Sequence, residues 1–171
     1  MKIRPETPSD HETICHLTKA AFEPMRFSDG TEADSLNSLR GDGDLTLSLV
    51  AADDASLVGH IAFSPVFIDG HRDGWFGLGP VSVWPRLQRK GIGSALLNEG
   101  LGRLRQIKAD GCILIGDPGY YSRFGFQSDG GLVYRDLPSR LVQWLAFGDR
   151  NEPRRVDRRL QLLRRWSHDK Q

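Results

Sequence analysis

The 171-residue chain has little cysteine and no long hydrophobic run. Its two cysteines, Cys15 and Cys112, are too few and too far apart for a disulfide framework or a metal site. No apolar stretch approaches the roughly 20 residues of a membrane-spanning helix, and the N-terminus lacks the apolar core of a signal peptide. We therefore expect buried thiols, no bound metal, a reducing cytoplasmic location and no membrane partner.

The chain also has no marked excess of positive or negative charge. The chain carries 23 Lys and Arg against 22 Asp and Glu, a formal net charge of +1. This balance gives no general attraction to nucleic acid, so we expect no nucleic-acid partner for the chain as a whole. A hydrophobic content of 39% and a charged content of 26% are those of a globular domain, and 171 residues suffice for one domain with its own core.

The C-terminal tail departs from this balance. Residues 149–171 hold seven arginines and one lysine against four acidic residues, a local net charge of +4. Apolar residues recur there at helical spacing, which predicts a basic amphipathic helix (Val156, Leu160, Leu163 and Trp166). The ordinary interpretation is a solvated helix packed on the domain, and contact with RNA, an anionic surface or a protein partner is the alternative. We divide the chain into a domain of residues 1–148 and a tail of residues 149–171.

Hydrophobic periodicity predicts alternating strands and helices before the tail. Ser9, with Glu12 as capping-box partner, is predicted to begin the first helix. Gly100 and Gly102 in the longest helix are interpreted as points of close packing against the sheet. We expect strands over residues 2–4, 45–52, 57–68, 75–83, 112–115 and 141–147, another entered at 124–126, and further helices over 31–40 and 91–109. The strand–helix–strand order makes the fourth and fifth strands parallel neighbours.

The most informative segment is the glycine-rich turn Gln88–Ser94, between a strand and a helix. Such a turn directs free backbone N–H groups and the positive end of a helix dipole at one point, which favours a phosphate or diphosphate. Gly91 and Gly93 allow close approach to the backbone, and Arg89 and Lys90 add positive charge. The spacing alone fits equally well with glycines kept for steric reasons. It does not fit the Walker or dinucleotide motifs, which require other residues at these positions.

A second motif makes the pattern more specific. Gln88, Gly91 and Gly93 match the Gln/Arg-x-x-Gly-x-Gly/Ala motif of the GNAT N-acetyltransferase superfamily. The segment Tyr121–Phe126 resembles the superfamily's Tyr-x-Lys/Arg-x-Gly-Phe motif, and the longer run Gly116–Phe126 is similar to its YhbS-like branch. The resemblance spans about residues 1–148.

The resemblance implies an α/β fold with helices on both faces of a mixed, mostly antiparallel sheet of six or seven strands. In this acyl-CoA N-acyltransferase fold the fourth and fifth strands are parallel and splayed, and acetyl-CoA is the co-substrate. Backbone amides of the turn would hold its diphosphate (Arg89, Lys90, Gly91, Ile92, Gly93 and Ser94). Backbone groups of Val81, Ser82 and Val83 would meet the pantetheine arm and the acetyl carbonyl.

The resemblance also suggests catalytic groups. Tyr121 would protonate the departing CoA sulfur, with Tyr120 in that role or a core position for Tyr121 as alternatives. The predicted fifth strand carries no acid, so the base has no obvious candidate there. His60 could accept the proton of the amine directly or through water, although a single strand histidine is more often structural. Asp29 and Glu32 are further candidates.

These residues predict transfer of acetyl from acetyl-CoA to a primary amine of a small molecule or peptide by direct attack. A non-catalytic acyl-CoA-binding or regulatory module is the alternative hypothesis, because the fifth strand lacks an acid and the tail departs from the family pattern. The identity of the acceptor stays open, and so does the choice between a monomer and a homodimer.

Overall fold

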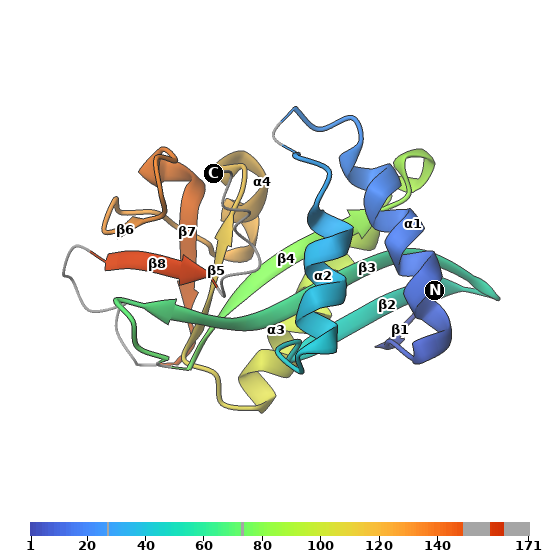
Figure 1. The fold of residues 1–171 in the computed structure, drawn as a ribbon, viewed down its shortest axis with the longest axis horizontal. Coiled ribbons are helices and arrows are strands. Elements are labelled where there is room, and N and C mark those ends of the chain that lie inside the picture. Colours follow the sequence, from blue (N-terminus) through green and yellow to red (C-terminus); the bar gives the residue numbers. More distant parts are fainter. Residues whose placement is uncertain (27, 73, 149–157, 163–171) are drawn as a thin grey trace. The chain divides into compact units, whose positions relative to one another are not determined.

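Two units make up the computed structural model, which describes residues 1–26, 28–72, 74–148 and 158–162 (Figure 1). Unit 1 comprises Met1–Ser64 and Gly79–Gly102, and unit 2 comprises Pro65–Leu78 and Arg103–Gln171. Within the described ranges, no helix combines the length and the hydropathy needed to cross a membrane.

From β1 to β5 the helices and strands follow the predicted order. The helices are α1 (His11–Phe22), α2 (Glu32–Gly41), α3 (Ile92–Gln106) and the short α4 (Pro118–Tyr121). The strands are β1 (Lys2–Pro5), β2 (Leu47–Asp53), β3 (Ser56–Ile68), β4 (Trp75–Val83), β5 (Gly111–Ile115), β6 (Leu132–Val133), β7 (Val142–Ala146) and β8 (Arg158–Leu162). β3, β4 and α3 each contribute residues to both units.

In unit 1 the strands lie in the order β1-β2-β3-β4, and helices cover both faces of the sheet. Ile14 of α1 and Leu36 of α2 pack with Val50 and Ala62 on one face. On the opposite face, α3 lies so close to β3 that a Cβ on Gly59 would be 2.9 Å from side-chain atoms of Ile92 and Leu96. Figure 1 shows this layering, with α1 and α2 in front of the strands and α3 behind them.

In unit 2 the strand order is β3-β4-β5-β7. β4 and β5 are parallel, as predicted, and the ladder between them runs from Trp75 opposite Gly111 to Gly77 opposite Ile113. β5 pairs with the antiparallel β7 along its whole length. The core of this unit is formed by buried residues of β3–β7 (Val66, Ile68, Trp75, Ile113, Leu132, Val142 and Trp144).

The sequence-based prediction of a helical tail is wrong over Arg158–Leu162. This segment is β8, which pairs antiparallel with Val66–Ile68 of β3 and parallel with β6. Hydrogen bonding to an available strand edge overrides the helical spacing of the apolar residues. The other tail residues, 149–157 and 163–171, lie outside the described residues, and so does the remainder of the predicted helix.

Three smaller predictions also need correction. The capping box is formed by Thr7 and Asp10, which start a 3-10 turn before α1, and not by Ser9 and Glu12. The segment 124–126 completes a 3-10 turn and reaches only an isolated bridge, Gln127 with Trp144, so the sixth strand comes later, at β6. Gly102 has open space around it, whereas Gly100 is packed as predicted.

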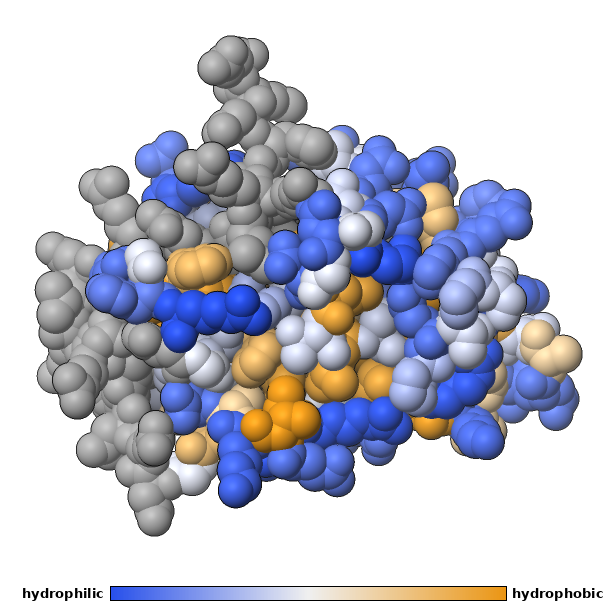
Figure 2. All heavy atoms as spheres, turned by 60° about the horizontal axis from the view of Figure 1, so that its bottom comes forward, coloured by the Kyte–Doolittle hydropathy of each residue, from blue (hydrophilic) through white to orange (hydrophobic). Residues whose placement is uncertain are grey.

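The surface follows the usual division of polar and apolar residues. Among the coloured residues of the face in Figure 2, hydrophilic ones predominate, and a smaller number of hydrophobic residues gather together. Large hydrophobic side chains are exposed at four of the described positions (Met1, Met25, Ile107 and Leu137).

Candidate active site

The glycine-rich turn of unit 1 is exposed and follows a tightly bonded segment at the end of β4. The amide of Leu87 donates to the carbonyl of Trp84 at 2.7 Å, so the chain turns sharply away from the sheet. Arg89 and Gly91 have φ values of 62° and 83°, and the side chains of Gln88, Arg89 and Lys90 are exposed. α3 then starts at Ile92, and the first-turn amides of a helix have no acceptor within it. The turn therefore has the geometry of an anion site.

The backbone of β4 next to this turn has two different edges. The amide of Trp84 donates to the carbonyl of Val58 on β3 at 3.5 Å, and the Ser82 carbonyl oxygen is 3.3 Å from where a Cβ of Gly59 would lie. The N–H of Trp84 and the carbonyl of Ser82 therefore face β3. Because successive residues of a strand alternate, Val81 and Val83 direct their backbone N–H and carbonyl groups away from β3. Of the three predicted contact residues, these two have backbone groups on the edge that β3 leaves open.

The side chain of Ser82 has a structural position. Ser82 and Thr18 are both fully buried, and the Ser82 hydroxyl donates to Oγ1 of Thr18 on α1 at 3.3 Å. This contact joins α1 to β4 beside the turn. It was not predicted, because the two residues are 64 positions apart and belong to no common motif.

His60 is held in a buried polar network on the α1 and α2 face of unit 1. Its side chain is completely buried, and Nε2 lies 2.8 Å from Oγ of Ser48. The Ser48 hydroxyl donates to Oε2 of Glu6, whose carboxylate also receives two hydrogen bonds from Arg40 at 2.6 and 2.9 Å. Nε2 of His11 lies 3.3 Å from Oε1 of the same carboxylate.

These contacts define the hydrogen-bonding roles. Burial favours the neutral form of Glu6, but the hydrogen bonds from Arg40 and Ser48, together with His60 Nε2 at 3.7 Å from Oε2, outweigh it and hold the pKa of Glu6 well below its usual range. Glu6 is thus an acceptor, and the single hydroxyl hydrogen of Ser48 is directed at it. His60 must then donate from Nε2, which leaves Nδ1 as a buried acceptor with no partner among the described residues. Burial lowers the pKa of His60 more than Glu6 raises it, so the imidazole is neutral at pH 7.

Tyr121 lies in unit 2, at the end of α4. Its ring contacts Tyr120 and Phe126 edge-on, at centroid distances of 4.9 and 6.1 Å. A Cβ on Gly116 would lie 2.6 Å from the Tyr121 ring, so the glycine makes room for it. Burial raises the pKa of Tyr121 to about 12, and the phenol therefore keeps its proton at neutral pH. The alternative residue, Tyr120, lies under the guanidinium of Arg123 at 4.7 Å.

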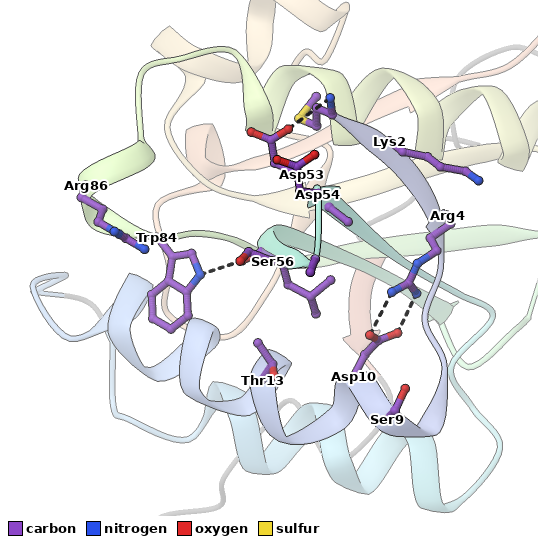
Figure 3. A pocket seen from close by; sticks show the side chains of 14 residues that line it. Lys2, Arg4, Ser9, Asp10, Thr13, Asp53, Asp54, Ser56, Trp84 and Arg86 are labelled. Carbon is purple, nitrogen blue, oxygen red and sulfur yellow. Dashed lines mark hydrogen bonds and ion pairs between the residues drawn. The ribbon is translucent and has the colours of Figure 1, made fainter.

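A polar groove of about 910 Å³ opens beside the start of the turn in unit 1 (Figure 3). Trp84 and Arg86 lie on one side of it, and on the other Arg4 makes a bidentate ion pair with Asp10 at 2.7 and 3.0 Å. Trp84 donates from Nε1 to the carbonyl of Leu57 at 2.8 Å, which fixes the end of β4 to the β2–β3 hairpin. The Trp84 side chain thus holds in place the end of β4, where the glycine-rich turn begins.

The cysteines take no part in these arrangements. Cys112 is a buried free thiol, as predicted, and burial raises its pKa. Cys15 was also predicted to be buried, but it is only half-buried. The part of the chain that the structure describes has no cluster of three or more His, Cys, Asp or Glu side chains suited to a metal ion.

Comparison with known proteins identifies the family. Residues 44–128 match the model of the acetyltransferase (GNAT) domain. The chain is 41% identical to the uncharacterized N-acetyltransferase YhbS of Escherichia coli (strain K12) over 128 residues, which cover 74% of each chain. The chain belongs to the GNAT acetyltransferase family. The matched segment contains β4, the glycine-rich turn and the Tyr121–Phe126 motif, so both motifs recognised in the sequence fall inside it.

Solved structures of family members extend this result to the fold. A GNAT family acetyltransferase from Brucella melitensis, crystallised with acetyl-CoA, is 43% identical to this chain and superposes with a TM-score of 0.85 over 97% of each chain. Escherichia coli YhbS in complex with CoA is 34% identical, with a TM-score of 0.79, and the match covers 86% of this chain and 82% of YhbS. The acyl-CoA N-acyltransferase fold, with its parallel β4 and β5, is thus confirmed.

Proposed function

We propose that this protein transfers the acetyl group of acetyl-CoA to a primary amine by direct attack of the amine on the thioester. The observation that carries the proposal is the exposed turn between β4 and α3, with Gly91 at a φ of 83° and the first amides of α3 directed out of the helix. A diphosphate is the CoA group that suits such a turn. The two relatives named above were crystallised with acetyl-CoA and with CoA, which supports the same ligand here.

In this proposal the amides of residues 89–94 hold the diphosphate, and the pantetheine arm follows the open edge of β4. Backbone groups of Val81 and Val83 would contact that arm and the acetyl carbonyl, and Ser82 would act only through its backbone and its contact with Thr18. A backbone N–H directed at the developing oxyanion lowers the barrier by about 3 kcal/mol. Tyr121 is the proposed general acid, because it stands at the motif position and its phenol stays protonated at neutral pH.

We assign His60 no direct contact with the amine. Its side chain is fully buried, and Nε2 is engaged with Ser48. Nδ1 could receive a proton only through a water molecule that reaches the core. The proposed base is therefore solvent, or a water held by His60, and an amine with a low enough pKa to be partly neutral at pH 7 is the expected acceptor.

Two measurements on the purified protein test the proposal. Isothermal titration calorimetry with CoA should show binding, and Gly91→Leu should abolish it, because a branched side chain at that φ distorts the turn. A thiol-release assay with acetyl-CoA and a panel of amines, including amino acids, polyamines and peptides, should then show turnover. CoA binding without turnover on any amine would favour an acyl-CoA-binding module, and the absence of CoA binding would reject both functions.

A further inference from the structure

Gln88 is the first residue of the glycine motif, yet its side chain turns back toward the strand. Its amide nitrogen, Nε2, donates a hydrogen bond of 3.1 Å to the backbone carbonyl of Val83. Its own backbone N–H is 3.4 Å from the carbonyl of Pro85. The Gln88 side chain thus links the start of the turn to Val83 at the end of β4, five positions earlier in the chain. Gln88 is an exposed residue, but the donor group of its side chain is engaged with the strand.

The carbonyl that Gln88 occupies lies on the open edge of β4. The Val83 carbonyl points away from β3, because the Trp84 N–H, on the opposite side of the same trans peptide group, donates toward β3. A carbonyl oxygen without a donor on this edge would present negative charge to any anionic or carbonyl oxygen nearby. Polar backbone groups of this kind are normally paired, and here a side-chain amide supplies the donor.

We infer that Gln88 is a positioning residue for CoA binding. By donating to Val83 it satisfies the carbonyl on the ligand edge of β4 and holds the turn at the angle that directs amides 89–94 toward one point. Trp84, bonded to Leu57 at 2.8 Å, holds the other side of the same segment. This inference rests on the proposed function and assigns the motif glutamine a role in shaping the site, with no contact to the ligand.

The test compares Gln88→Met, which keeps the length and removes the donor, with Gln88→Arg, which restores a donor of similar reach. Gln106→Met is the matched control, since Gln106 is an exposed glutamine at the end of α3. We expect Gln88→Met to raise the Kd for CoA by about three- to tenfold in calorimetry, the effect of one hydrogen bond. Gln88→Arg should lie within about twofold of wild type, and so should Gln106→Met.

A spectroscopic readout on the ligand-free protein separates positioning from a general loss of stability. The carbonyl ¹³C resonance of Val83 should move upfield in Gln88→Met and stay in place in Gln106→Met, while the melting temperature falls by only a few degrees. A Kd for CoA that changes less than twofold in Gln88→Met, or an unmoved Val83 resonance, would overturn the inference. If the wild type itself does not bind CoA, the proposed function fails instead, so the two failures are distinct.

Discussion

Glu6 and Arg40 form a bidentate ion pair across 34 residues of sequence, with Nε 2.6 Å from Oε1 and Nη2 2.9 Å from Oε2. Glu6 directly follows β1, and Arg40 lies in the last turn of α2. Both side chains are mostly buried, with exposures of 12% and 15%. The pair therefore fixes the last turn of α2 to the edge of the unit 1 sheet, at a place where neither residue belongs to a motif.

Removing the cation should destabilise the protein strongly. In Arg40→Met the carboxylate of Glu6 stays buried with Ser48 as its main donor, and a buried charge that loses its partner costs about 3 kcal/mol. Urea unfolding followed by circular dichroism measures this loss. Arg72→Met, at an exposed arginine, should change the unfolding free energy by less than about 0.5 kcal/mol. A loss below about 1 kcal/mol in Arg40→Met would mean that solvent screens the pair as it does on a surface.

The buried imidazole of His60 should make stability depend on pH near neutrality. Its pKa is lowered in the folded state, whereas an unfolded histidine titrates near 6.5, so below that pH the unfolded chain binds the additional proton. The contribution of neutral His60 to the unfolding free energy is then fully present above about pH 6.5 and is lost as the pH falls. The unfolding free energy should decrease by about 1 kcal/mol between pH 7.5 and 5.5. Urea midpoints at four pH values in this range measure the slope.

The matched variants for this experiment are His60→Gln, which keeps a donor toward Ser48 but does not titrate, and His71→Gln at an exposed histidine. The dependence of the urea midpoint on pH should be weaker in His60→Gln and unchanged in His71→Gln. The carboxylates of Glu6 and Asp10 affect stability in a lower pH range. The lowered pKa values of Glu6 and Asp10 add stability that is present above about pH 4.3 and is lost in stronger acid. An unchanged slope in His60→Gln would assign the pH dependence to other groups.

The sequence predicts those parts of the molecule that depend on local pattern. The place of the turn, α3 and the parallel pairing of β4 and β5 follow from periodicity and from short motifs, because each depends on neighbouring residues. Glu6, Thr18 and Arg40 were not predicted, since their partners are 34 to 64 residues away and a charged or hydroxyl side chain gives no sign of being buried.

In the C-terminal tail, by contrast, a local pattern predicts the wrong element. The tail's apolar residues have helical spacing, yet Arg158–Leu162 forms β8 because strand edges of β3 and β6 are available to it. Tertiary pairing of this kind cannot be seen in a local window, and it decides between helix and strand for a short segment. The role of His60 was similarly open, because strand alternation gives its face of the sheet but not the network that surrounds it.

Replacing Gly100 or Gly102 of α3 by alanine should change the unfolding free energy in opposite directions. A Cβ on Gly100 would lie 2.4 Å from the ring of Phe63, whereas Gly102 has open space. Gly100→Ala should therefore lower the unfolding free energy by about 1–3 kcal/mol through overpacking. Gly102→Ala should raise it by about 0.5–1 kcal/mol, since alanine favours the helix. Thermal unfolding of the pair tests this, and equal shifts in both variants would show that packing against Phe63 does not decide the outcome.

The hydroxyl of Tyr121 should matter for turnover and not for acetyl-CoA binding. Tyr121→Phe removes the hydroxyl and leaves the contacts with Gly116 and Phe126, so acetyl-CoA affinity should stay within about twofold of wild type. If the phenol protonates the departing thiolate, turnover with an accepted amine should fall by about a hundredfold. Because the pKa of Tyr121 is about 12, wild-type turnover should show no loss from ionisation of this group up to about pH 10. Tyr120→Phe is the matched control, one residue away. Equal turnover in Tyr121→Phe and wild type would remove Tyr121 from the mechanism, and a loss confined to Tyr120→Phe would transfer the role to that residue.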